Sequence, residues 1–131
     1  MPVIIPPGRK IAVKIIGNSS DISSATQLPI LDHADNVITL NSNYKDEFIL
    51  TGLSITTASN LVVGLFYNSG ASKIIYQSHC LANTQVWVPF DPNMVVPITN
   101  SLWIKASGSG VVYWNIYGYV TRVKTIGLNG Y

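Results

Sequence analysis

The residues best suited to chemistry are two histidines and one cysteine: His33, His79 and Cys80. A catalytic nucleophile needs a base within hydrogen-bond reach and a third group that orients the base. His79 and Cys80 are neighbours in a segment that alternates like a β-strand, so their side chains point to opposite faces and cannot pair. We therefore predict that the chain is not an enzyme.

The acidic residues show no metal-binding pattern. Asp32 and Asp35 flank His33, but the segment lacks the alternating oxygen ligands and the glycine of a calcium loop. A structural zinc needs four closely spaced Cys or His ligands, more than this chain supplies. The glycine turn at residues 108–110 has no lysine after it and leads into a strand, unlike a phosphate-binding loop. We predict no metal and no cofactor, and a loop whose acids cap local backbone amides.

The aromatic residues are more informative. Tyr113, Tyr117 and Tyr119 share one face of a predicted final strand, and Asn115 lies among them. The opposite face of that strand is apolar and is predicted to be core: Val112, Trp114, Ile116 and Val120. Trp87 and Trp103 alternate in the same way against the apolar residues of their own strands, which places them on outer faces.

Three interpretations of the tyrosine face are open. The tyrosines could cover the second face of the sheet with their hydroxyls in solvent, since tyrosine is often only partly buried. They could form a subunit interface, where tyrosine brings a large area with few rotatable bonds. They could also stack on sugars, for which the strand offers only Asn115 as a polar partner. Outward aromatics on several strands favour an oligomer.

Strands must position these side chains. Within residues 10–16, Ile11, Val13 and Ile15 face one way while Lys10 and Lys14 face the other, a period of two. Further strands are predicted at residues 37–40, 48–56, 61–67, 73–79, 85–90, 102–106 and 111–120. Gly52, inside one of these segments, indicates a bulge or a close backbone approach.

The resulting fold class is all-β. No segment carries a sustained helical period, and about eight strands separated by turn signals predict a β-sandwich or barrel. We predict a single antiparallel jelly-roll-like β-sandwich of about eight strands, occupying residues 26–131, with an extended N-terminal arm or first strand at residues 1–25.

Composition points to association with other protein. Of the 131 residues 47% are hydrophobic and only 11% are charged, yet no apolar run approaches the roughly 20 residues of a membrane-spanning helix. We expect no membrane contact and expect the excess apolar surface to be buried between subunits. A net charge of +2 is too small to indicate nucleic-acid binding. The single cysteine excludes an intrachain disulfide, and the start lacks the features of a signal peptide, which suits synthesis in a host cytoplasm.

The N-terminal segment has its own character. Prolines at positions 2, 6 and 7 impose extended backbone around the apolar Val3, Ile4 and Ile5, and Arg9 and Lys10 follow. A plain tail is one interpretation. An arm that docks on a neighbouring protein, with the basic residues meeting a polar or acidic partner, is the other.

The segment from Glu47 to Tyr119 resembles small jelly-roll structural proteins of tailed bacteriophages, of the capsid decoration (cement) or head- and tail-fibre type. An apolar strand comes first, followed by a hairpin with tyrosine and small residues. A strand of the form Ser-Leu-Trp-Ile-Lys then leads through a glycine turn to a final strand that ends near a tyrosine. The segments that carry the resemblance are FILTGLSI, LFYNSG, VPF, NSLWIKASG and the strand from Val111 to Tyr119.

This resemblance implies a symmetric virion component, often a homotrimer, whose N-terminal arm grips the shell, and it transfers no catalytic or metal residues. The expected function is a capsid decoration protein on the outer surface of a phage shell, with the major capsid protein or another virion protein as its partner. The alternative is a fibre module that binds a receptor or carbohydrate. A small esterase or nuclease fragment is a third hypothesis, which the missing catalytic pairs argue against. The candidate interface residues are Val3, Ile4, Ile5, Arg9, Lys10, Trp87, Trp103, Tyr113, Tyr117 and Tyr119.

Overall fold

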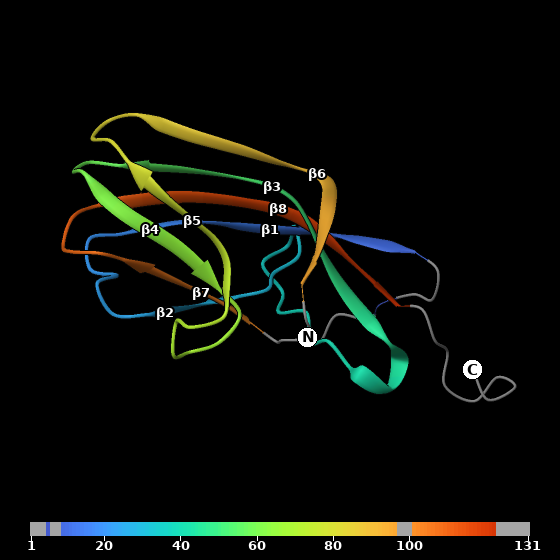
Figure 1. Cartoon of the computed structure of the whole chain (residues 1–131). Coiled ribbons are helices and arrows are strands. Elements are labelled where there is room, and N and C mark those ends of the chain that lie inside the picture. The colour runs from blue at the N-terminus through green and yellow to red at the C-terminus, as the bar shows by residue number, and fades with distance from the viewer. Residues whose placement is uncertain (1–4, 6–8, 97–100, 123–131) are drawn as a thin grey trace, which may run out of the picture.

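The computed structural model describes residue 5 and residues 9–96 and 101–122, and it consists of two antiparallel four-stranded sheets packed face to face (Figure 1). A short 3-10 turn, η1 (Ser42–Tyr44), precedes the third strand. The eight strands are β1 (Lys10–Ser19), β2 (Thr26–Pro29), β3 (Asp46–Thr57), β4 (Leu61–Phe66), β5 (Ile74–Cys80), β6 (Gln85–Val96), β7 (Ser101–Ala106) and β8 (Val112–Arg122). The predicted all-β sandwich of eight strands is therefore confirmed.

The strand order is that of a jelly roll. One sheet has the order β1-β8-β3-β6 and the other β2-β7-β4-β5, so the first strand pairs with the last, the second with the seventh, and so on inward. This nesting is a long hairpin rolled into two sheets, the eight-stranded architecture found in viral capsid and lectin domains. It leaves β6 and β5 as the last strands at the same side of the two sheets (Figure 1).

The core lies between the two sheets and is built from the inward side chains of every strand. Because strand side chains alternate, each strand contributes every second residue. β8, for example, turns Val112, Trp114, Ile116 and Val120 inward and its tyrosines outward, as predicted. The largest fully buried side chains include Phe48, Leu50, Leu53, Leu65, Leu102, Ile104 and Ile116.

Two strand predictions are corrected. Residues 37–40 do not form a strand: Val37 makes an isolated bridge with Leu31, and Ile38 and Leu40 reach the core from irregular backbone. Apolar spacing alone cannot separate a buried loop from a short strand. The four-residue β2 was not predicted, because a polar segment ending in proline gives no alternation signal.

β6 continues six residues beyond the predicted end at Phe90, through Pro92 to Val96. Its two prolines, Pro89 and Pro92, are compatible with a ladder because β6 is an edge strand that needs partners on one side only.

The predicted irregularity at Gly52 is present. The register of β3 against both β6 and β8 shifts between Leu50 and Gly52, as a β-bulge requires. Gly118 lies opposite on β8, where a Cβ atom would collide with the carbonyl oxygen of Ile49. The bulge thus brings the two central strands too close for any side chain at position 118.

A buried ion pair ties the two central strands together at one end. The guanidinium of Arg122, the last residue of β8, donates from Nε and Nη2 to the two carboxylate oxygens of Asp46, the first residue of β3, at 2.8 and 2.9 Å. Asp46 also accepts a hydrogen bond from the backbone N–H of Asn41 at 2.7 Å. The hydrogen bonds to Asp46 raise the pKa of Arg122. The guanidinium carbon lies 3.9 Å from the ring centroid of Tyr44, a cation–π contact.

The predicted N-terminal arm or first strand at residues 1–25 includes the first strand of the sandwich. Residues 10–19 form β1, which pairs along its whole length with β8, and Ile5 is buried in the core of this chain. Val3, Ile4 and the rest of residues 1–4 and 6–8 lie outside the described residues. No helix in the described part of the chain is long and apolar enough to span a membrane.

Candidate functional site

Four aromatic residues lie on the outer surface of the β1-β8-β3-β6 sheet, and we call this surface the aromatic face. Trp87 is 56% exposed, Tyr113 50% and Tyr117 40%, while Tyr119 is half-buried. The tyrosine side of β8 is therefore an outer surface and not part of the core. Two exposed aliphatic residues of the neighbouring strands, Ile16 and Val95, point the same way, since they lie in register with Asn115 and Ile49.

The aromatic rings are held in defined positions. Trp87 and Tyr117 meet edge to face with ring centroids 6.0 Å apart, the geometry that aromatic quadrupoles favour. Trp87 lies against Gly52, with its Cη2 atom 3.1 Å from the place a Cβ would occupy, so the bulge glycine makes room for the indole. At the other end, Nζ of Lys10 lies 4.5 Å from the centroid of the Tyr119 ring.

These rings already shield a thin second layer on the outer side of the sheet. Ser54 and Ile49 point outward from β3, yet both are buried, and Ile49 does not belong to the main core. The side-chain amide of Asn115 donates to the hydroxyl of Ser54 at 3.2 Å. The aromatic face is thus a packed surface with fixed rings, which lowers the entropy lost when a partner binds.

β6 is incompletely buried along nearly its whole length. Of its twelve residues only Val96 is buried, although the strand carries apolar side chains on both faces. Its outward residues Trp87 and Val95 are exposed. Its inward residues remain half-buried: Val86, Val88, Phe90 and Met94.

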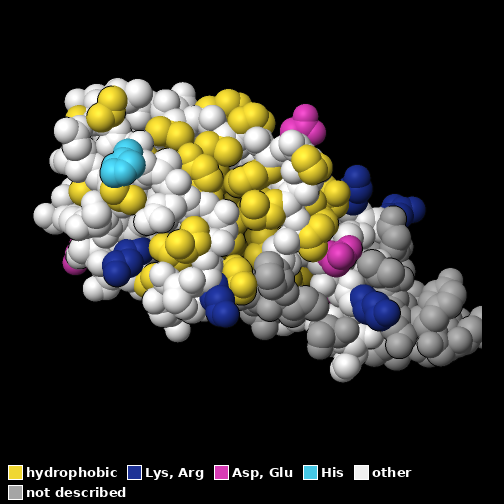
Figure 2. Space-filling model, in the orientation of Figure 1, with side chains coloured by type: hydrophobic (Ala, Val, Ile, Leu, Met, Phe, Trp, Pro, Cys, Tyr) yellow, Lys and Arg dark blue, Asp and Glu magenta, His cyan; other side chains and the backbone are white. Residues whose placement is uncertain are grey.

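The same is seen on the neighbouring strand of the opposite sheet. Ile75 and Tyr76 of β5 are half-buried, and Tyr76 packs edge to face on Phe90 of β6 with centroids 6.4 Å apart. Figure 2 shows hydrophobic side chains gathered in a band across the middle of the view, over the region between the β5 and β6 ribbons of Figure 1. We call this surface the β5–β6 side. It is continuous with the aromatic face through β6.

The other predicted interface residues are dispersed. Trp103 is half-buried on the outer surface of the opposite sheet, where it is in register with Phe66, so it does not join Trp87. Arg9 and Lys10 are exposed, while Ile5 is in the core and not available to a partner.

The residues considered for chemistry are far from a catalytic arrangement. His79 is exposed and Cys80 is buried, so they point to opposite faces as predicted. The carboxylate of Asp32 accepts hydrogen bonds from the backbone N–H groups of Asn36 and Ala34, both at 2.9 Å. The predicted amide-capping loop is therefore confirmed, and the bond from Asn36, followed by that from Ala34, lowers the pKa of Asp32. In the described part of the chain no three His, Cys, Asp or Glu side chains group closely enough to hold a metal ion.

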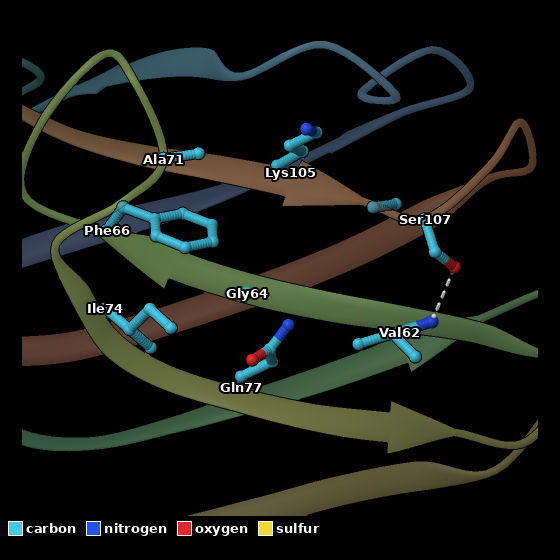
Figure 3. Close-up of a pocket in the computed structure, with 9 residues that line it drawn as sticks. Val62, Gly64, Phe66, Ala71, Ile74, Gln77, Lys105 and Ser107 are labelled. Carbon is cyan, nitrogen blue, oxygen red and sulfur yellow. Dashed lines mark hydrogen bonds between the residues drawn. The ribbon is translucent and has the colours of Figure 1, made fainter.

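A pocket of about 240 Å³ lies on the outer surface of the β2-β7-β4-β5 sheet, opposite the aromatic face (Figure 3). Gly64 of the central strand β4 is its floor, and the ring of Phe66 folds over that glycine so closely that a Cβ there would lie 2.6 Å from Cζ. Gln77 of β5 points toward Gly64, and Lys105 of β7 stands at the rim. The lining consists of Val62, Gly64, Phe66, Ala71, Ile74, Gln77, Lys105, Ala106 and Ser107.

This pocket was not predicted from the sequence. One signal was present: a glycine within an apolar strand, two residues before an aromatic, indicates a close approach over the glycine. The polar lining residues come from three strands, and their meeting depends on the order of strands in the sheet.

The comparisons with known proteins leave the family open. No protein-family model matches the chain, and no curated protein matches it. A solved structure described as "Bacillus endospore appendages form a novel family of disulfide-linked pili" is similar over 93% of this chain and 97% of that chain, with 11% sequence identity and a TM-score of 0.49. A similarity at this level carries no functional inference.

Proposed function

We propose that this protein is a non-enzymatic structural subunit that assembles through β6, using the β5–β6 side and the adjoining part of the aromatic face. The observation that carries the proposal is the incomplete burial of β6. A twelve-residue strand that holds seven hydrophobic residues besides its prolines and buries one of them within its own chain leaves apolar surface for another subunit to cover.

The chemistry of β6 fits a protein interface. Asp91 is the single charged residue among its twelve, and depletion of charge with enrichment of aromatic residues marks the centre of protein interfaces. Pro89 and Pro92 lack backbone N–H donors, so extension of the sheet by a further strand along the middle of β6 is disfavoured. Association is therefore expected through side-chain packing.

A second copy of the chain is the partner we propose first, in a closed homotrimer. A closed symmetric assembly covers the same apolar surface on every subunit, so no copy of that surface stays exposed to add further subunits. The finer proposal is a phage capsid decoration protein, which would sit on the outer surface of a shell. The sequence resemblance and the jelly-roll strand order, common to viral capsid domains, support it. A protein that binds only the assembled shell stabilises the shell by mass action.

The first test is the mass of the purified chain by light scattering after size exclusion, at micromolar concentration. We expect three times the chain mass of 14.2 kDa. The double variant Trp87→Ser, Val95→Ser removes two exposed side chains of β6 without opening the core, and it should dissociate. Loss of a buried interface tryptophan typically costs at least about 2 kcal/mol, or about 30-fold in affinity. Val37→Ser, at an exposed residue outside β5, β6 and the loop between them, is the matched control and should leave the mass unchanged.

A wild-type chain that stays monomeric over this concentration range would refute assembly through β6. The decoration role is tested separately, by co-sedimentation of the purified chain with undecorated phage shells. A trimer that does not sediment with shells would remove that role and leave the assembly proposal standing.

A further inference from the structure

The pocket over Gly64 lies on the sheet opposite the aromatic face. A role for this pocket is therefore separate from the proposed assembly function. Its floor is backbone: Gly64 pairs with Gln77 of β5 on one side and with Lys105 of β7 on the other. Since neighbouring strands engage the peptide groups of β4 on both sides, side chains must provide the recognition.

One half of the pocket is apolar. The Phe66 ring, Ala71 and Ile74 form this wall, as Figure 3 shows, while Val62 lies at the other end of the pocket beside Ser107. Phe66 is buried outside the main core, so its ring serves this outer surface and not the interior of the sandwich. Such a wall suits the C–H face of a small saturated ring.

The other half is polar and rich in donors. Lys105 offers an ammonium group, and no ion pair of Lys105 exists within the part of the chain that is described. Gln77 adds a side-chain amide with two donors and one acceptor. The Ser107 oxygen accepts from the backbone N–H of Val62 at 2.9 Å, which leaves its hydroxyl proton free to donate. With no acidic residue in the lining, the pocket favours a ligand with several acceptor oxygens and one negative charge.

The volume limits the ligand to one small ring. Pockets for drug-sized ligands hold about 300–1,000 Å³, and this one holds about 240 Å³. A peptide C-terminus is disfavoured, because proteins capture it in concave arrangements of free backbone N–H groups, and here the backbone of β4 is fully paired. An aliphatic ring with hydroxyl groups and a carboxylate matches both halves.

We propose that this pocket binds a single acidic sugar residue of the uronic acid class. Its C–H face packs on the Phe66 wall, its hydroxyls meet the Gln77 amide and the Ser107 hydroxyl, and its carboxylate meets Lys105.

The test is a titration of the full, ¹⁵N-labelled chain with sodium glucuronate to about 10 mM, because a single sugar in a shallow site binds at about 1 mM. We expect saturable shifts of the Gly64 backbone amide and the Gln77 side-chain amide. Glucose and sodium acetate are the matched probes. Glucose lacks the carboxylate, and acetate lacks the ring and its hydroxyls, so each should bind at least about fivefold more weakly than glucuronate.

Lys105→Gln should weaken glucuronate binding at least about fivefold and abolish the preference over glucose. Lys73→Gln, at an exposed lysine outside the lining, is the control and should bind like the wild type. Absence of shifts with glucuronate would overturn the site, and equal binding of acetate would overturn the sugar. Equal binding of glucose, or an equal loss in Lys73→Gln, would overturn the role of Lys105. The Trp87→Ser, Val95→Ser variant should bind glucuronate normally, so failure of this proposal and failure of the assembly proposal are distinguishable.

Discussion

The ion pair between Asp46 and Arg122 should be among the most stabilising polar contacts of the fold. Asp46 is fully buried, and the Arg122 side chain is 16% exposed. The pair joins the ends of β3 and β8, the two central strands that carry the middle of the aromatic face. We predict that Asp46→Ala destabilises the protein far more than loss of a surface charge does.

The expected magnitude follows from what the substitution leaves behind. The Arg122 guanidinium loses both carboxylate contacts, and the backbone N–H of Asn41 loses its 2.7 Å acceptor. Breaking a buried pair from one side costs about 3–5 kcal/mol, because an uncompensated charge stays behind. Arg122 keeps some solvent contact and its Tyr44 ring, so we expect the lower end, about 3 kcal/mol.

The assay is urea unfolding followed by tryptophan fluorescence, with all variants at one protein concentration because assembly contributes to apparent stability. Asp35→Ala is the matched control: Asp35 pairs with Lys14 at 3.4 Å but is 71% exposed. Exposed pairs contribute about 0–1 kcal/mol. Asp46→Asn, which retains an acceptor for Asn41, should fall between the two.

Losses of free energy for Asp46→Ala and Asp35→Ala that agree within about 1 kcal/mol would refute this reasoning. Such a result would mean that water reaches the Arg122 guanidinium after the substitution and replaces the carboxylate at little cost.

Two further predictions concern the bulge and the amide-capping loop. Gly118→Ala should destabilise by at least about 3 kcal/mol in the same unfolding assay, because the new Cβ meets the backbone carbonyl of Ile49, which cannot move without opening the sheet. Gly108→Ala, where the new Cβ finds only an ordinary 3.6 Å contact, should stay within about 0.5 kcal/mol, and equal effects would contradict the bulge geometry. Asp32 should titrate below the usual range for aspartate, as read from the pH dependence of the Asn36 backbone amide shift. Since its pKa is lowered on folding, its contribution to stability is present above the unfolded-state pKa and is lost as the pH falls through the folded-state pKa. A titration at or above the usual aspartate range would contradict the capping geometry.

The local part of the structure could be predicted from the amino-acid pattern of each segment. Alternation with a period of two identified most of the strands and the side of β8 that carries its tyrosines, because the pleat sends successive side chains to opposite faces whatever the neighbouring strand is. The same alternation predicted that the side chains of His79 and Cys80 point to opposite faces. Gly52, a glycine inside a strand, indicated the bulge. The alternation was misleading at two places. Residues 37–40 are mostly apolar but form no strand, and β2 pairs with β7 although its sequence shows no alternation.

Which strands pair with one another could not be predicted from these patterns and depends on the complete fold. Asp46 and Arg122 are 76 residues apart and meet because β3 and β8 are neighbours in the sheet. Trp87 and Trp103 show the same outward alternation in sequence, yet they lie on opposite sheets.

The incomplete burial of β6 and the pocket over Gly64 are likewise products of strand order. β6 is exposed because it is an edge strand, and the pocket combines side chains of β4, β5 and β7 that only pairing brings into register. The direction of a side chain relative to its own strand is a local property of the backbone. The identity of its neighbours depends on long-range pairing, which the pattern within one segment does not encode.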